Sequence, residues 1–310
     1  MTYSPAASVP TCSPDVDILH HIGLIARNLD ALAHRYEALG FTVTPVSYPL
    51  IPLRAGQEPQ PVGVGNRCVI FRNNYLEFLG VVDPERWASV SLAERGPFDI
   101  DRPLRRYEGL HVLHLGADDL DVVSRRLAAS GIDHQPIRPF QRLVDTPAGL
   151  RMMRARTLSL RPGAMPEALF QIIQHETPEL VLQPRHMDHA NGAHGLVDVI
   201  VCVEDSNEVA ARYAAAAGKN VQVDGRVRRI GLGRSDVLVT DTLGLRDILP
   251  GIEPPTLPWL AGFTVAANLA RSTAFLVRRG IACVHVDGHL VVAPDRAHGA
   301  AIRFRHEARA

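Results

Sequence analysis

Cysteine is scarce in this chain of 310 residues, and the few cysteines present are far apart. Cys12, Cys68, Cys202 and Cys283 form no CxxC pair and no other close pair. This spacing argues against a cysteine-rich zinc site and against the disulfide framework of a small secreted protein. We therefore expect a protein of the reducing cytoplasm.

An excess of charge of either sign is also missing. Lys and Arg together number 33, as do Asp and Glu, so the formal net charge is zero. A strong global field that would attract nucleic acid or an anionic membrane is therefore not expected. No window approaches the roughly 18 uninterrupted apolar residues of a membrane span, and the N-terminus lacks the pattern of a secretion signal. We interpret residues 1–16 as a flexible leader.

Two motifs of nucleotide and ester chemistry are missing as well. There is no GxSxG elbow, which places a nucleophilic serine in many hydrolases. The glycines of GVGNRC, residues 63–68, precede a predicted strand and not a helix, which is the wrong order for a dinucleotide-binding loop. The remaining composition, 46% hydrophobic and 21% charged, is typical of a globular protein with about two domains.

A local pattern near the N-terminus occurs four times along the chain. It consists of an apolar strand, an Asn or Asp that can cap a helix, an amphipathic helix and a glycine that ends it. In the first copy Asn28 is the cap and apolar residues recur at spacings of three and four. The glycines that end the four helices are Gly40, Gly131, Gly218 and Gly280.

Short predicted strands follow each helix. In the first two copies they are 41–46, 66–72, 75–82, 150–160 and 169–175; in the last two they are 226–232, 236–240, 245–249, 284–287, 290–293 and 300–305. Each unit is thus predicted to be β-α-β-β-β. One helix covers only one face of such a sheet, so the units are expected to pair. We expect an α+β fold of four βαβββ modules in two halves, 17–185 and 194–310, separated by a polar connector.

These features resemble the vicinal oxygen chelate superfamily, and within it the bacterial glyoxalase-like domain proteins. The resemblance is carried by HHIGLIARNLD, GNRCVIF, YLEFLGVVDP, QHETPELV and HANGAHG, and it covers about residues 17–200. Over 201–310 it rests on the module pattern alone. It implies that two modules curl their sheets into an incomplete barrel around a divalent metal. The ligands would come from the first and last strands of each module.

In the first module the resemblance points to His21 and Glu77. Because side chains alternate along a strand, His20 shares a face with Ile22 and Leu24, which suit a covering helix. His21 is then expected to face the cavity and His20 to be structural. A His nitrogen and a Glu oxygen suit Zn, Fe, Mn, Ni or Co, and two ligands do not distinguish among them.

The second module departs from this pattern. The position equivalent to His21 is Val112, which cannot bind a metal. His114 lies on the same face as Val112 and is the substitute we expect, whereas His111 lies on the opposite face. The position of the second module that is equivalent to Glu77 is Gln171, which could be a weak metal ligand or a hydrogen-bond donor to the substrate.

Two further residues complete the catalytic candidates. His175 shares the face of Gln171 and could be a ligand or a general acid or base. Tyr75 shares the face of Glu77 and could orient a substrate. The alternatives for Gln171 and His175 stay open.

The third and fourth modules lack this donor set. Their corresponding positions are Asp198, Asp247, Ala261 and Arg303, and an acidic pair facing an arginine favours a structural ion pair. In the connector, His186, His189 and His194 lie close in sequence, but without cysteine or a second cluster they favour a polar linker over a zinc site. Arg102, Arg105 and Arg106 favour a solvated face over an anion site.

Two functions from different classes follow. The first is a metal-dependent enzyme of glyoxalase, isomerase or dioxygenase type, in which His21 and Glu77 hold the metal and His114 or His175 assists. The second is a metal-free protein that sequesters a small organic molecule. The expected partners are a small-molecule substrate and, at most, a second copy of the chain, with no nucleic acid and no membrane.

Overall fold

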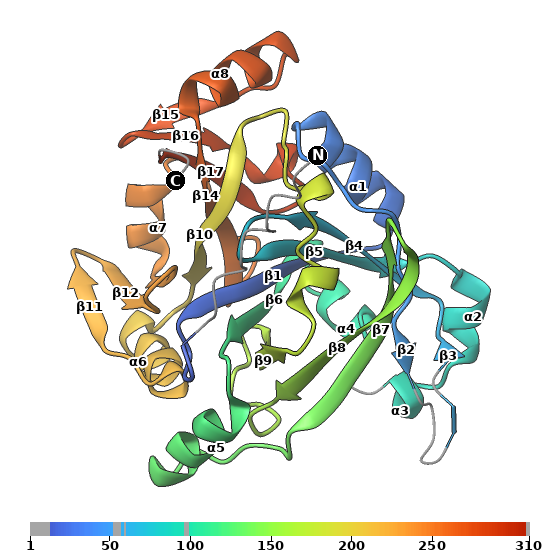
Figure 1. The fold of residues 1–310 in the computed structure, drawn as a ribbon. Helices are drawn as coiled ribbons and strands as arrows, with labels where there is room; N and C mark the ends of the chain where they lie inside the picture. Colours follow the sequence, from blue (N-terminus) through green and yellow to red (C-terminus); the bar gives the residue numbers. More distant parts are fainter. Residues whose placement is uncertain (1–12, 52–56, 59, 96–98, 308–310) are drawn as a thin grey trace, which may run out of the picture.

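The computed structural model describes residues 13–51, 57–58, 60–95 and 99–307, which fold into four consecutive units (Figure 1). Residues 1–12 of the predicted leader, Cys12 among them, lie outside the described part. The last residues of the leader pack onto the fold, because Val16 is fully buried and Asp15 forms an ion pair with Arg126 at 2.6 Å.

The N-terminal half contains the first two units. The first comprises β1 (Ile18–Ala26), α1 (Leu29–Ala38), β2 (Leu50–Ile51), β3 (Gln60–Pro61), β4 (Val64–Ile70) and β5 (Tyr75–Val81). Three short helices then lead to the second unit: α2 (Pro84–Ser89), α3 (Leu92–Arg95) and α4 (Asp101–Leu104). The second comprises β6 (Gly109–Gly116), α5 (Leu120–Ala129), β7 (Arg138–Thr146), β8 (Gly149–Leu158) and β9 (Leu169–His175).

The C-terminal half repeats the arrangement after two 3-10 turns, η2 (Pro178–Leu180) and η3 (Pro184–His186). The third unit comprises β10 (Ala193–Cys202), α6 (Ser206–Ala217), β11 (Val221–Asp224), β12 (Val227–Gly231), β13 (Asp236–Thr240) and α7 (Thr242–Ile248). The fourth comprises β14 (Trp259–Ala267), α8 (Leu269–Arg278), β15 (Val284–Val286), β16 (His289–Val292), η4 (Pro294–Arg296) and β17 (Ala301–His306).

The predicted helix boundaries are confirmed at both ends of the repeated helix. The side chains of Asn28, Asp119, Asp205 and Asn268 each accept a backbone N–H of the first turn. The four predicted glycines all have positive φ, between 65° and 88°, which side-chain-bearing residues rarely adopt. Figure 1 shows α1, α5, α6 and α8 on the outside of the strands.

The modules pair through their first strands, as expected for two halves. In every unit the first strand pairs in parallel with the last, as β1 does with β5 and β6 with β9. The antiparallel pairs β1·β6 and β10·β14 join the units of each half. A single bridge between Leu110 and Leu260 connects the two halves, and the sheet of the described strands does not close on itself. The predicted fold of four modules in two incomplete barrels is confirmed.

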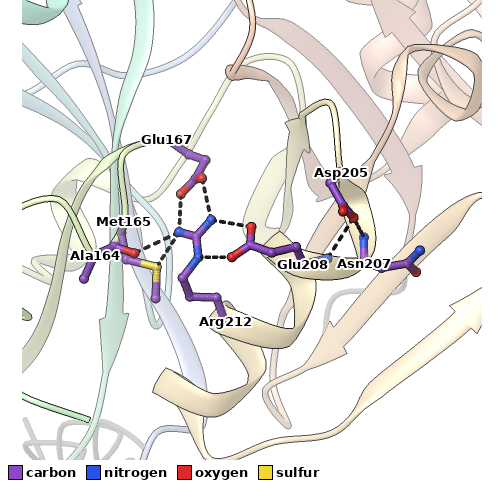
Figure 2. A network of polar contacts seen from close by, with 7 residues as sticks. All are labelled: Ala164, Met165, Glu167, Asp205, Asn207, Glu208 and Arg212. Atoms are coloured by element: carbon purple, nitrogen blue, oxygen red, sulfur yellow. Dashed lines mark hydrogen bonds and ion pairs between the residues drawn. The ribbon is translucent and has the colours of Figure 1, made fainter.

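A partly exposed arginine also joins the two halves (Figure 2). Arg212 of α6 binds Glu167, which precedes β9, at 2.8 Å, and it donates to the carbonyl of Ala164 at 2.8 Å. On its exposed side it binds Glu208, one helical turn earlier, at 2.9 Å. The Glu167 side chain is only 4% exposed, so its charge is stabilised chiefly by this one guanidinium.

Two predicted strands are wrong. Residues 41–46 form no strand. Thr44 N–H bonds to the Cys68 carbonyl, but Pro45 has no N–H to extend this pairing, and the first bridge is Ser47–Asn66. Residues 245–249 lie mostly in α7, which begins at Thr242 and is capped by the side chain of Asp241. Asp247 is therefore an exposed helical residue and not part of a last strand, which is β13 instead.

Candidate functional site

His20 and His21 both turn toward the inner side of the N-terminal half. The antiparallel register of β1 and β6 pairs Leu19 with Leu115 and His21 with His114, so His20 is an extra residue in β1. Such a bulge breaks the alternation of side chains. The prediction that His20 faces the covering helix is therefore wrong: its Nδ1 lies 2.6 Å from Nδ1 of His21.

His114 lies directly beside His21. The two residues are opposite each other in the register of β1 and β6, and His114 Nδ1 is 2.8 Å from His21 Nε2. Val112 faces Gly23 in the same ladder. The structure thus brings together the two histidines that the sequence analysis chose on different grounds, one from each module.

Glu77 reaches the same point from β5. It is opposite Gly23 in the parallel pair, and its Oε2 lies 3.6 Å from His21 Nε2. Its Oε1 accepts a hydrogen bond from Asn66 Nδ2 at 2.5 Å. Burial raises the pKa of Glu77 to about 7, while Arg142 and the Asn66 hydrogen bond partly oppose that shift.

The three catalytic candidates lie at different distances from this centre. Tyr75 stacks on His21 with ring centroids 4.5 Å apart and an angle of 11°. His175 packs against His20 at 4.6 Å, one ring further out. Gln171 is opposite His114 in the ladder, but its amide donates to Ser159 Oγ at 3.0 Å.

The histidines of this cluster are neutral. Burial lowers the pKa of His20 and His21 well below the usual value, and that of His114 and His175 to about 3. The contacts also indicate a tautomer: if His21 Nδ1–H donates to His20, its Nε2 keeps a lone pair directed at His114 and Glu77. A metal-binding histidine commonly has this arrangement, with its other nitrogen donating to a neighbour.

The chemistry of the donor set fits a divalent metal. Two ligand atoms each about 2.1 Å from one ion are separated by about 3.0 Å at a right angle and about 3.4 Å at a tetrahedral angle. The separations at His21 Nε2, 2.8 Å to His114 and 3.6 Å to Glu77, bracket these values. Within the described ranges, however, no three His, Cys, Asp or Glu side chains already form a metal cage. A bound ion would have to replace the direct contact between His21 Nε2 and His114 Nδ1. The proton of the neutral His114 ring would then be on Nε2, which leaves Nδ1 free to bind the ion.

Other residues at the site were not selected as candidates from the sequence. Asn66 donates to Glu77, and its Oδ1 accepts from Ser47 Oγ at 3.2 Å. Arg142 of β7 donates to Ser47 Oγ at 2.6 Å. Arg142 lies outside every predicted strand, so no pattern marked it. Its partners come from a segment almost 100 residues earlier, which only the fold brings near.

The remaining candidates do not form a second metal site. His189 is buried, with Nδ1 accepting from Thr42 N–H and Nε2 bonded to the carbonyl of Ile70. A hollow of about 240 Å³ lies beside it at the connector, away from the His21 cluster. In the third and fourth units Asp198 and Arg303 are both buried, yet no ion pair within 4.0 Å joins them among the described residues.

Close packing at Gly23 supports the geometry of the site. A Cβ there would lie 2.8 Å from Val112 Cβ and 3.4 Å from Glu77 Oε2. We expect Gly23→Ala to lower the free energy of unfolding by about 1–3 kcal/mol, measured by urea denaturation. Gly195→Ala in β10 is the matched control, because its Cβ would meet only Ala266 at 3.6 Å. Equal urea midpoints for the two variants would contradict the prediction.

No helix in the described part of the chain is long and apolar enough to cross a membrane.

Curated proteins with a significantly similar sequence were not found. Many solved structures share the fold, among them the following three. A hypothetical protein from Staphylococcus aureus has a TM-score of 0.63 at 11% identity, with 93% of this chain and 99% of that chain covered.

The other two are enzymes. The Mn(II)-bound glyoxalase from Novosphingobium aromaticivorans has a TM-score of 0.50 at 11% identity, covering 97% of this chain and 84% of that one. Homoprotocatechuate 2,3-dioxygenase from Arthrobacter globiformis has a TM-score of 0.50 at 10% identity, covering 98% and 84%. At these identities the likeness concerns the fold alone. The family described as Glyoxalase-like domain matches residues 19–217, which include every candidate site residue. The chain therefore belongs to the glyoxalase-like domain family.

Proposed function

We propose that this protein is a metal-dependent enzyme that acts on a small organic substrate with vicinal oxygens, by glyoxalase- or isomerase-type or by dioxygenase-type chemistry. The observation that carries the proposal is the meeting of His21, His114 and Glu77, which come from three strands of two paired modules. The fold shared with a Mn(II)-bound glyoxalase and a dioxygenase supports it.

In this proposal His21, His114 and Glu77 hold one divalent ion, which would be Zn, Fe, Mn, Ni or Co. When bound, the ion supplies Lewis acidity toward the vicinal oxygens of the substrate. His20 fixes the orientation and tautomer of His21 through the Nδ1 contact, and Tyr75 holds the His21 ring by stacking. His175 and Gln171 border the cluster and offer further hydrogen-bonding groups to a substrate.

A second candidate function is metal-free binding of a small organic molecule. The observation that favours it is the direct contact between His21 Nε2 and His114 Nδ1, which gives each of these nitrogens a hydrogen-bond partner without an ion. In that case the same polar groups would only orient a bound ligand.

Metal analysis separates these candidates. Protein purified without a His-tag is dialysed in turn against Mn²⁺, Zn²⁺ and Fe²⁺ under anaerobic conditions, and its metal content is measured by plasma mass spectrometry. We expect about one ion per chain with at least one of the metals, as in a single site of three protein ligands. Retention of none of them contradicts the proposal and favours the binding protein. Oxygen uptake with catechol then distinguishes dioxygenase from isomerase chemistry.

Cytoplasmic location, a homodimer and the division into 17–185 and 194–310 stay predictions. The scattered cysteines support the first, since Cys68, Cys202 and Cys283 are all free.

A further inference from the structure

Arg142 crosses from the second module to the first. It lies in β7, forms an isolated bridge with Pro49, and donates from Nη1 to Ser47 Oγ. The residue is only 7% exposed. The arginine that enters this region is therefore held by backbone and side-chain contacts on the opposite module.

This buried cation has no carboxylate partner among the described residues. None of the ion pairs within 4.0 Å includes Arg142, and Asp145 on the same strand binds Arg185 at 2.7 Å instead. Glu77 is near enough for Arg142 to lower its pKa, but not near enough to form an ion pair. Burying a guanidinium costs free energy unless an anion compensates it, so the position favours an anionic ligand.

A small hollow is available beside the guanidinium. It measures about 40 Å³ and is lined by Arg142, Ser47, Cys68 and Gln183, and also by Asp145, whose carboxylate is paired with Arg185. A single water molecule needs only about 10–15 Å³ of such space, so the hollow has room for a small polar group such as a carboxylate. Arginine binds carboxylates through two parallel hydrogen bonds, which suits a group held at one end of a ligand.

The hollow is connected to the candidate metal ligands by direct contacts. Ser47 binds Arg142 and donates to Asn66, and Asn66 in turn donates to Glu77. Asn66 Oδ1 also lies 3.6 Å from Cys68 Sγ in the wall of the hollow. A carboxylate held at Arg142 would therefore be separated from Glu77 by only two side chains, Ser47 and Asn66.

We propose that Arg142 binds a carboxylate of the substrate, so that the substrates are small organic acids with vicinal oxygens. This inference rests on the proposed function, because the vicinal oxygens are assigned to the His21, His114 and Glu77 centre. Neutral analogues of the same shape bind less tightly, since they leave the guanidinium without its anion.

The test compares L-lactate with L-lactamide, which have the same shape and differ in charge. Dissociation constants are measured by saturation-transfer NMR titration on Zn²⁺-treated and chelator-treated full-length protein, with the metal content of each sample determined. Arg142→Gln and Arg142→Lys are compared with Arg138→Gln, which changes an exposed arginine at the start of the same strand. Circular dichroism and the thermal midpoint identify any variant that fails to fold, and Arg142→Lys then keeps the test informative.

We expect the wild type and Arg138→Gln to bind lactate at least about tenfold more tightly than lactamide, as for hydrogen bonds to a charged group. Arg142→Gln should reduce that preference to about twofold or less, with Arg142→Lys between them and the metal content unchanged. Equal binding of both probes by the wild type, no binding of lactate, or a preference that persists in Arg142→Gln overturns the inference. Metal without a preference for lactate leaves the proposed function intact. A preference for lactate without metal retains Arg142 as an anion site and rejects the metal enzyme.

Discussion

Replacing His21 with alanine is expected to weaken divalent-metal binding by more than about 100-fold. Changes to groups that only support a ligand already cost about 10- to 100-fold, and His21 lies between both other proposed ligands. The measurement is the dissociation constant of Zn²⁺, obtained by competition with a chromogenic chelator at fixed pH. His21→Ala should approach the behaviour of His21→Ala/Glu77→Ala.

His111→Ala is the matched control for this experiment. His111 is a buried histidine of β6 that stacks on Tyr107 at 4.0 Å and bonds to the Tyr107 carbonyl, outside the His21 cluster. Its removal should cost stability and leave the Zn²⁺ dissociation constant within about threefold of the wild type. Equal loss of affinity in the two variants would show that the metal responds to general loosening of the sheet and would reject His21 as a ligand.

Replacing Arg212 with alanine is expected to lower the free energy of unfolding by about 3 kcal/mol. The substitution leaves the carboxylate of Glu167 buried at 4% exposure without its cation, and breaking a buried pair from one side costs about 3–5 kcal/mol. We take the lower end because Arg212 itself is 25% exposed. The measurement is urea denaturation followed by circular dichroism.

Glu208→Gln tests the other arm of the same network (Figure 2). Glu208 is 57% exposed and pairs with Arg212 across one helical turn, so its loss should cost at most about 0.5 kcal/mol. A double variant, Arg212→Ala/Glu167→Gln, should recover part of the loss by removing the buried charge. If Arg212→Ala and Glu208→Gln lower the free energy of unfolding by the same amount, the pair of Arg212 with Glu167 does not hold the two halves together.

The repeat and its helices could be predicted because their signals are local. Asn28 and Gly40 act within one turn of the helix that they bound, so their roles follow from neighbouring residues alone. Strands 245–249 and 41–46 were misassigned for the opposite reason. Their apolar residues are compatible with more than one kind of secondary structure. The Asp241 cap places residues 245–248 in a helix, and Pro45 interrupts strand pairing in residues 41–46.

The candidate site could be predicted only in part. His21, Glu77 and His114 were chosen from motif position and strand alternation, and the structure places all three within contact of one another through His21. His20 was misplaced because a bulge depends on how β1 pairs with β6, which alternation within one strand does not reveal. Asn66 and Arg142 gained their significance from partners distant in sequence.

By itself, the sequence determined the α+β modules, their number, their pairing and the residue types available for a metal. These depend on caps, glycines and hydrophobic periodicity, which act over a few residues. Only the tertiary structure decided that His20 joins the cluster, that Arg142 is buried with no carboxylate partner among the described residues, and that Arg212 connects the halves. The reason is physical: burial and long-range pairing set the cost of a charge, and neither exists until the strands of different modules are assembled.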